Sequence, residues 1–342
     1  MRRWKGYQKG INLGGWLSQC SHTKENYETY ITESDIEKIA SWGLDHVRLP
    51  IDYEMAATKG GAFKEEGFSY IDKCINWCRK YGLNLVLDLH KTAGYCFDEN
   101  VGDITFFESR LLQEQFYQLW EEIAKRYGKY SDFVAFELLN EVVDKSVIKQ
   151  WNDIILCAIE RIRYFAPKTV LVVGGVSYNS VTSIKFLPKP YDKNIVYNFH
   201  CYEPMLFTHQ AAHWMKEMTA DFYMQYPCSL EQMKQKTLEV LGDERGEIFA
   251  VEDLYTLGSD FFEKIFREAL VFSQKWDVPL YCGEYGVIDR APLDGTLQWF
   301  KDIHTVLEKY QIGRAVWNYK GKDFGISDTH YDAIREKLIQ FL

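Results

Sequence analysis

The chain has 342 residues, of which 46% are hydrophobic and 26% are charged, and its formal net charge is −9. This composition supplies a sizeable core and excludes wholesale disorder. The negative charge argues against nucleic acid or an anionic membrane as the main partner, and the length allows either two ordinary domains or one large α/β barrel.

Short apolar runs alternate with longer segments of helical period, a pattern typical of βα units around a parallel sheet. The runs that predict strands are residues 10–15, 46–50, 83–90, 133–141, 170–174, 195–202, 280–284 and 315–319. The segments that predict helices are 34–42 (capped by Thr32), 70–81, 111–127, 146–165 and 260–276. Eight repeats predict a (β/α)₈ TIM barrel formed by residues 1–342 as one domain. A doubly wound open sheet is the rival.

The spacing between the sixth and seventh predicted strands is far longer than one loop and one helix need. The segment 203–257 is rich in Met, Tyr, Phe and charged residues, and it includes the helix-like stretch SLEQMKQKTLEVLG. We expect an inserted, mainly helical subdomain that walls one side of a catalytic cleft. A surface decoration is the alternative.

The N-terminal sequence MRRWKGYQKGINLGG is basic but lacks the apolar stretch and cleavage site of a secretory signal. The chain also contains no run of about 18 or more apolar residues, so we expect no membrane span. The eight cysteines are scattered, without CxxC or Cys/His ligand spacing. This pattern favours reduced thiols in a monomeric cytoplasmic protein, with export by an unrecognised route as the alternative.

Two glutamates stand where apolar strand-like runs end. Glu141 closes FVAFELLNE, and Glu284 lies near the end of PLYCGEYG. In a barrel, active groups gather at the carboxyl ends of the strands, because the interior is filled by packed side chains. Two carboxylates about 5–5.5 Å apart at that face can act as acid and nucleophile in a retaining cleavage of a glycosidic bond.

The two carboxyl groups need opposite charge states, so their surroundings must push their pKa values apart. Arg48, in DHVRLP, is suited to hold Glu284 ionised, because a nearby cation favours the charged form. Glu141 follows the apolar Leu138 and Leu139, and poor solvation there would keep it protonated.

Further polar and aromatic residues close the other predicted strands. Asn140 could donate a hydrogen bond to the sugar 2-hydroxyl, and Tyr202 could orient the nucleophile. His90 and His200 would bind hydroxyls or tune the carboxylates, and Trp317 would form the floor for the sugar next to the scissile bond. Taken singly, each has a structural explanation, since an Arg beside a strand is often an ion-pair partner and a Trp on a strand is more often core.

At these residues the chain resembles glycoside hydrolase family 5 of clan A, almost from end to end. The shared motifs are INLGGW, HVRLP, LDLH, LLNE, YNFHCY, GEYG and AVWNYK. More narrowly, the chain is similar to the single-domain bacterial endoglucanases of the clostridial CelC type, through AFELLNEVV, IVYNFH, FTHQAAHW and LYCGE as well. The resemblance implies a retaining endo-β-glucanase that cuts β-1,4-glucan or mixed-linkage β-glucan without a cofactor or metal. It also implies Glu141 as acid/base and Glu284 as nucleophile, with a surrounding set of Arg48, His90, Asn140, His200, Tyr202 and Trp317.

One departure from the family pattern follows His90, where the chain continues KTAGYCF. Many relatives carry a His or a neutral residue and then Pro-Gly at this point. Lys91, with Tyr95 and Phe97 nearby, is therefore a candidate for altering which sugars the non-reducing side accepts. A solvated lysine on the rim is the equally weighted alternative.

Other candidates are weaker. His209 and His213 lie four apart and could chelate a metal from one helix face, but the HExxH pattern is absent, which favours packing or a roof over the site. GINLGG and VVGG lack the spacing of a dinucleotide site. Trp16, Phe207 and Tyr255 are possible sugar platforms for which a structural role is the favoured interpretation.

Three alternatives to endo action stay open at this point. An exo-acting β-glucosidase or β-1,3-glucanase and a β-mannanase share the same catalytic residues and differ in their loops. A non-catalytic carbohydrate-binding barrel is disfavoured, because binding alone needs no paired acid and nucleophile.

Overall fold

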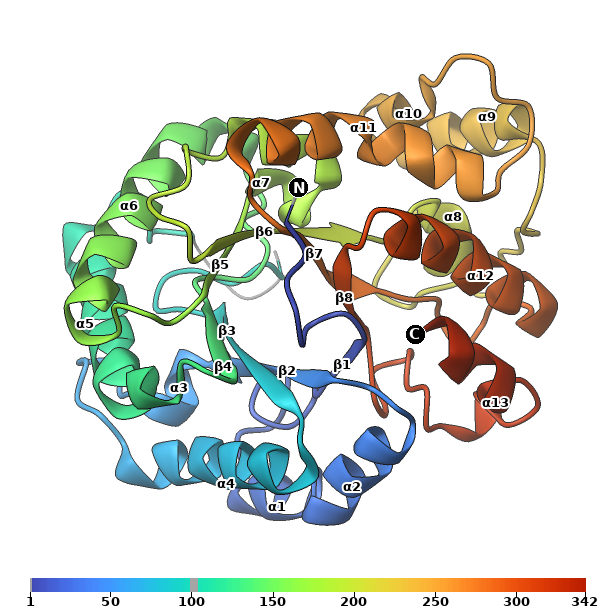
Figure 1. Cartoon of the computed structure of the whole chain (residues 1–342). Coiled ribbons are helices and arrows are strands. Elements are labelled where there is room, and N and C mark those ends of the chain that lie inside the picture. The colour runs from blue at the N-terminus through green and yellow to red at the C-terminus, as the bar shows by residue number, and fades with distance from the viewer. Residues whose placement is uncertain (1, 99–103) are drawn as a thin grey trace.

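Eight parallel strands close into a barrel in chain order, with β1 paired to both β2 and β8 (Figure 1). The computed structural model describes residues 2–98 and 104–342. The strands are β1 Gly10–Asn12, β2 His46–Asp52, β3 Asn84–Lys91, β4 Val134–Glu137, β5 Leu171–Gly174, β6 Ile195–Cys201, β7 Leu280–Tyr285 and β8 Gly313–Val316. The predicted (β/α)₈ barrel is confirmed, and the open-sheet alternative is excluded.

The long helices surround the barrel, and each buries one apolar face. In chain order, the α-helices of the described residues are α1 Lys24–Thr29, α2 Glu33–Ser41, α3 Tyr53–Ala56, α4 Glu65–Tyr81, α5 Arg110–Tyr127, α6 Ile148–Phe165, α7 Val176–Asn179, α8 Met205–Thr208, α9 Leu230–Leu241, α10 Asp243–Gly246, α11 Ser259–Trp276, α12 Leu293–Lys309 and α13 Arg335–Leu338. Thr32 caps α2 as predicted, in a reciprocal capping box with Asp35. The sequence analysis did not predict α12, whose first turn contains Gly295 and Thr296, two residues that disfavour helix.

The predicted strand 133–141 is wrong in its last four residues, because β4 ends at Glu137. Leu138 and Asn140 still donate backbone hydrogen bonds to the neighbouring strands β5 and β3. Glu141, however, has a φ of 42°, in the left-handed region that ends extended structure. The chain therefore turns at Glu141 instead of running straight through it.

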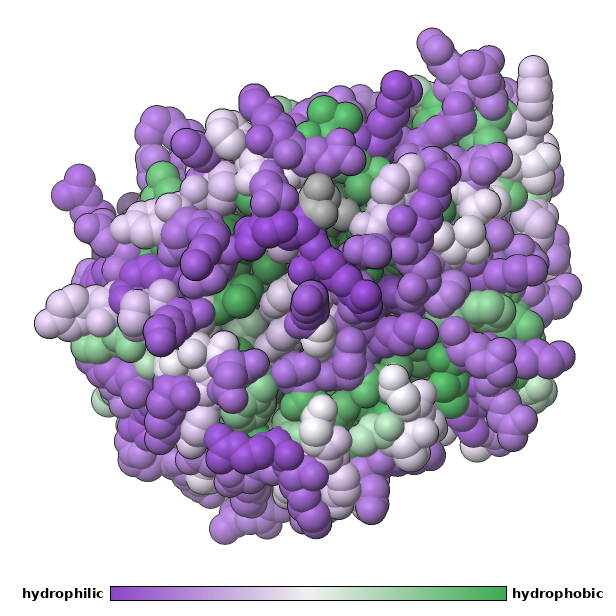
Figure 2. Space-filling model, viewed as in Figure 1, coloured by the Kyte–Doolittle hydropathy of each residue, from purple (hydrophilic) through white to green (hydrophobic). Residues whose placement is uncertain are grey.

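The amino end of the barrel is filled by apolar side chains. One buried cluster combines the N-terminal segment with the first residues of several strands: Trp4, Tyr7, Val86, Ala135, Val172, Val196, Tyr281 and Ala315. In Figure 1 the N-terminal segment, in dark blue, crosses this end of the barrel. In Figure 2, which has the same view, hydrophilic residues cover much of the surrounding surface.

The segment 203–257 leaves the barrel after β6 and returns at α11. It holds α8, α9, α10 and a short 3₁₀ helix at Glu247–Phe249, while residues 209–224 form turns and loops. Figure 1 places α9 and α10 beside α11, outside the ring of barrel helices. None of the helices in the described part of the chain has the length and apolar character needed to cross a bilayer.

Candidate active site

Arg48 is the centre of a buried polar network at the carboxyl end of the barrel. Its side chain projects from β2 and is completely buried. Nε and Nη2 donate to the two oxygens of Glu137 at 2.7 and 2.9 Å, while Nη1 donates to Asn12 Oδ1 and Nη2 to Asn140 Oδ1, each at 2.9 Å. Nη1 also donates to Glu284 Oε1 at 2.7 Å. A rigid guanidinium bound on all sides fixes the positions of its partners.

Glu284 accepts a hydrogen bond on each of its two carboxyl oxygens. Arg48 binds Oε1, and the Tyr202 hydroxyl donates to Oε2 at 2.9 Å. The structure therefore places Arg48 and Tyr202 against Glu284 in the way the sequence predicts.

Glu141 lies in a different environment. Burial raises its pKa from 4.5 to about 7, although the charges of His90, Arg48 and Arg245 act to lower it. Its left-handed backbone is supported by Tyr95, whose hydroxyl donates to Glu141 O at 2.5 Å and accepts from Val143 N at 2.9 Å. A carboxyl group with such a pKa can hold a proton near neutral pH.

His200 stands between the two carboxyl groups. Its Nδ1 lies 2.7 Å from Glu141 Oε1 and 3.7 Å from Glu284 Oε2. One oxygen of Glu141, one ring nitrogen of His200 and one oxygen of Glu284 all lie within 4.8 Å of one another. Burial lowers the pKa of His200 to about 4, so the imidazole is neutral at ordinary pH.

His90 and Trp317 form a stacked pair of rings in the same site. Their rings stack at 5.7 Å with an angle of 8° between the planes. His90 Nδ1 lies 2.7 Å from Asp88 Oδ2, and burial lowers the pKa of His90. Asn140 Nδ2 faces His90 Nε2 at 3.4 Å.

The motif INLGG serves to seat Trp317. A Cβ on Gly14 would lie 2.5 Å from the indole, so only glycine fits beneath the ring. Gly14 also exchanges two hydrogen bonds with the Asn318 amide, at 2.9 and 3.0 Å. The loops after β1 and β8 therefore act together to hold Trp317 in place.

All predicted site residues meet in one place. Beneath them lies a layer of buried polar side chains that was not predicted. Asn12, Asp88, Glu137 and Asn198 are fully buried within the strands. Asn198 Nδ2 donates to Glu137 Oε1 at 2.7 Å, and Asp88 lies 3.0 Å from Arg48. The available signal was a polar residue inside each of several apolar strand runs.

The weaker candidates for metal or sugar binding lie in different surroundings. Helix α8 ends at Thr208, so His209 and His213 do not share a helix face. His209 packs against Tyr202 at 4.9 Å between ring centres, while His213 is exposed. Trp16 and Phe207 are fully buried and have no face free for a sugar, whereas Tyr255 is 86% exposed.

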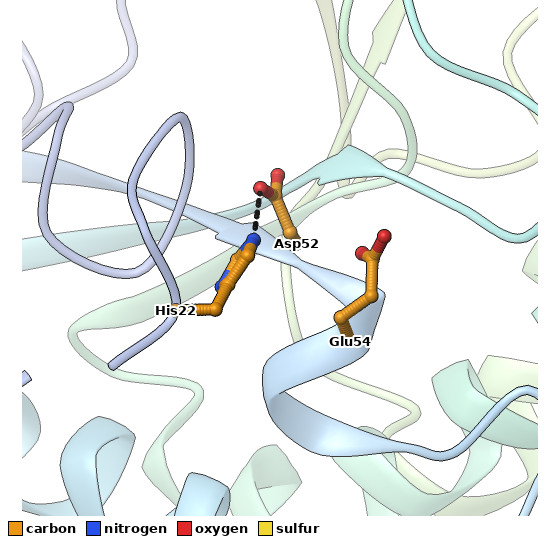
Figure 3. Close-up of side chains that lie close together, drawn as sticks. All are labelled: His22, Asp52 and Glu54. Atoms are coloured by element: carbon orange, nitrogen blue, oxygen red, sulfur yellow. Dashed lines mark ion pairs between the residues drawn. The ribbon is translucent and has the colours of Figure 1, made fainter. Parts of the chain in front are cut away.

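A second polar cluster lies on the rim beside His90 (Figure 3). His22 Nε2 contacts Asp52 Oδ2 at 3.1 Å, and Glu54 points toward the same space. Lys91 Nζ binds Glu54 Oε1 at 2.5 Å, so this lysine is held by an ion pair and is not a freely solvated rim residue. The hydrogen bond to Asp52 raises the pKa of His22 to about 10. Each carboxylate of the cluster therefore already has a cationic partner.

Comparison with known proteins places this constellation in a family. The family model Cellulase (glycosyl hydrolase family 5) matches residues 6–323. The chain is 44% identical to Cellodextrinase A of Ruminococcus flavefaciens over 92% of this chain and 86% of that protein. It is 41% identical to Endoglucanase C of Acetivibrio thermocellus over 98% of both chains. Crystal structures of Thermotoga maritima Cel5A, at 23% identity and a TM-score of 0.77, share the fold over 98% of this chain and 97% of that one.

Proposed function

The chain belongs to glycoside hydrolase family 5, and we propose that it is a retaining endo-β-glucanase that acts within β-1,4-glucan or mixed-linkage β-glucan chains. Its substrate is a glycan, and the reaction is hydrolysis of a glycosidic bond.

One observation carries the proposal: two carboxyl groups lie close together in unlike surroundings. Oxygens of Glu141 and Glu284 come within 4.8 Å of each other. This spacing supports the retaining mechanism, since inverting enzymes hold their carboxyl groups about 6.5–9.5 Å apart. Arg48 and Tyr202 each donate a hydrogen bond to Glu284, while burial raises the pKa of Glu141 to about 7.

The unlike surroundings assign the roles. Glu284 attacks the anomeric carbon while Glu141 donates its proton to the glycosidic oxygen, and the leaving part of the glucan departs. Glu141, now ionised, takes a proton from a water molecule that attacks the same carbon and releases Glu284. Two inversions give net retention, and the cycle uses only these two carboxyl groups.

The surrounding side chains position the sugar at the scissile bond. Trp317 and His90 form a stacked pair on one side, and Asn140 is fixed by Arg48 with its amide directed toward His90. We assign Trp317 as the floor under the sugar that becomes bonded to Glu284. We assign Asn140 as the donor to its 2-hydroxyl, a contact that strengthens at an oxocarbenium-like transition state.

A second candidate is preferential action on short β-glucan oligosaccharides. The relative named Cellodextrinase A supports it, as does the position of the segment 203–257 after β6. The two candidates share the same chemistry and differ in the chain length that the site accepts.

Glu284→Gln tests the mechanism. The variant should lose roughly 10⁴-fold in kcat on cello-oligosaccharides, because a neutral amide cannot act as the nucleophile. For Glu284→Ala, azide should restore turnover and give a glycosyl azide of inverted configuration. Glu252→Gln, an exposed carboxyl group in the insert, is the matched control. Near wild-type turnover of Glu284→Gln would remove Glu284 from its role.

Product analysis tests the substrate. Cello-oligosaccharides, lichenan, laminarin and mannan should be compared, and the anomeric form of the first product followed by NMR. Rapid fall in the viscosity of a soluble β-glucan supports endo action, whereas release of one short product from the outset supports the oligosaccharide candidate. Cleavage of laminarin or mannan in preference to both would replace the proposed linkage.

A further inference from the structure

The short helix α10 brings the inserted segment 203–257 back onto the rim of the barrel. Glu244 Oε1 contacts Lys145 Nζ at 2.7 Å, in the loop after β4. The Arg245 guanidinium lies over the ring of Tyr178, 5.2 Å from its centre, in the loop after β5. A segment that leaves the barrel at β6 thus reaches the loops of the two preceding strands.

Tyr178 is held beside Glu141 by the backbone. Tyr178 N donates to Val142 O at 3.1 Å and Ser177 N donates to Val143 O at 3.2 Å, directly after Glu141 in the chain. Ser177 and Tyr178 both have a left-handed backbone, with φ values of 55° and 58°. The tight turn after β5 therefore fixes the Tyr178 backbone against the segment that carries Glu141.

The positive charge of Arg245 interacts electrostatically with Glu141. It is one of the cations that act to lower the pKa of Glu141, and it also acts on His209. Arg245 itself is exposed, and among the described residues no carboxylate forms an ion pair with it. Its guanidinium is therefore oriented by an aromatic ring, while its N–H donors remain available.

The position of Arg245 relative to Glu141 and Glu284 indicates which part of the substrate it can contact. On the proposed function, the sugar bonded to Glu284 rests on Trp317, which stacks with His90 on the side of β8 and β3. The proton donor acts at the glycosidic oxygen, where the leaving part of the glucan begins. In the barrel order, β5 and β6 lie across from the β8 and β3 side, so on the proposed function the leaving sugar extends toward the loops that carry Tyr178 and α10.

We propose that Arg245 binds the hydroxyl groups of the first sugar on the leaving side, and that the Tyr178 ring holds its guanidinium in place. This inference rests on the proposed function and deepens it, because it assigns to the insert a residue that selects substrate. A planar guanidinium offers paired N–H donors that match two neighbouring hydroxyls of a glucose ring. An uncharged sugar gains a charge-assisted hydrogen bond there without displacing an ion-pair partner.

Arg245→Ala tests this with two substrates, cellotetraose and a nitrophenyl β-cellobioside, whose leaving group carries no sugar hydroxyls. Below about pH 6 Glu141 is protonated with or without the arginine, since removal of a cation raises its pKa further above about 7. The loss in kcat/KM should be about tenfold on cellotetraose and less than about twofold on the aryl glycoside. Arg267→Ala, an exposed arginine on α11, is the matched control.

Arg245→Lys separates hydroxyl binding from charge. It keeps the cation but loses the planar pair of donors, so most of the cellotetraose loss should remain. Full recovery by lysine, equal losses on both substrates, or unchanged kinetics in Arg245→Ala would each overturn the inference. Failure of the wild-type chain to cleave any β-glucan would instead overturn the proposed function.

Discussion

The two ends of the barrel use the same eight strands for opposite purposes. At the amino end, Trp4 stacks on Tyr7 at 3.9 Å and meets Tyr281 edge-on at 5.2 Å, within a buried apolar cluster. At the carboxyl end, the fully buried Arg48 faces Asp88, Glu137 and Glu284. The first arrangement stabilises by burial of apolar surface, whereas the second places charge where water cannot solvate it.

The buried charge at the carboxyl end explains why that end is suited to acid–base chemistry. One guanidinium serves three carboxyl groups, and burial raises the pKa of Asp88 to about 7 and that of Glu141 to about 7 as well. Only some of the carboxyl groups can be ionised together, so protons are retained near neutral pH. On the proposed function, this network, which is costly to bury, thus supplies both the nucleophile and the acid.

After Glu284, the largest effect is expected at the proposed acid. Glu141→Ala should lower kcat on unactivated β-glucan by roughly 10³–10⁴-fold, because nothing then protonates the departing oxygen. Activated aryl glycosides, whose leaving groups need little protonation, should lose far less in their first step. Steady-state and burst kinetics on both substrates measure this, and equal losses on both would contradict the acid assignment.

The pH profile of the wild-type chain gives the companion test. Because the acid must be protonated, kcat/KM should fall as pH rises through about 7, the raised pKa of Glu141. In Glu141→Ala this alkaline limb should disappear. A limb that is unchanged in the variant would belong to another group.

Arg48→Met is the next largest perturbation, and it should act on both stability and activity. It leaves buried carboxyl groups without their cation, which should cost about 3–5 kcal/mol in unfolding free energy at neutral pH. Activity should drop roughly 10³-fold, because Glu284 loses its main partner. Urea unfolding and kcat/KM measure the two effects.

The pH dependence of this variant sharpens the comparison. Without Arg48, the folded-state pKa values of Glu137 and Asp88 rise further, so these groups fold in their protonated forms. The stability deficit should therefore shrink as the pH is lowered toward about 5. A deficit that stays constant with pH would mean that lost packing, and not stranded charge, is the cause.

Trp4→Ala probes the opposite end. Removal of this buried indole should cost about 3–4 kcal/mol of stability through lost burial and a cavity. The kcat should stay within about twofold of wild type below the melting transition, because the catalytic groups lie at the other end of the strands. Trp4→Phe, as a milder control, should cost less, and a large loss of kcat in either variant would break the proposed division between the ends.

The sequence predicts one of these ends better than the other. Glu141, Glu284, His90 and Trp317 are found because each stands near the end of a recognisable apolar run, and parallel strands bring such positions to one face. The eight-fold repeat predicts the closed barrel for the same reason. Alternation of helical and strand periods is a local property that survives in the fold.

The deeper layer of buried polar residues cannot be predicted from apolar runs alone. Asn12, Glu137 and Asn198 come from three separate strands, and only the closing of the barrel shows that Asn12 and Glu137 bind Arg48 while Asn198 binds Glu137. His22 comes from a loop without periodicity. Likewise, the contact of Arg245 with Tyr178 joins two segments separated by strand β6 and by residues 209–224, which lack helical or strand structure, so no local pattern predicts it.

The smallest expected effect comes from the ion pair of the partly exposed His22 with the buried Asp52, which lies apart from the Arg48 network. The pKa of His22 is raised from 6.5 to about 10, so its contribution is complete below about pH 6.5 and is lost as the pH rises toward 10. His22→Asn should therefore be less stable than wild type by on the order of 1 kcal/mol at pH 6, since solvent screens the pair. Urea unfolding should show a smaller difference at about pH 9. An equal difference at both pH values would mean that His22 stabilises through packing, and that charge at the carboxyl end matters only where it is buried.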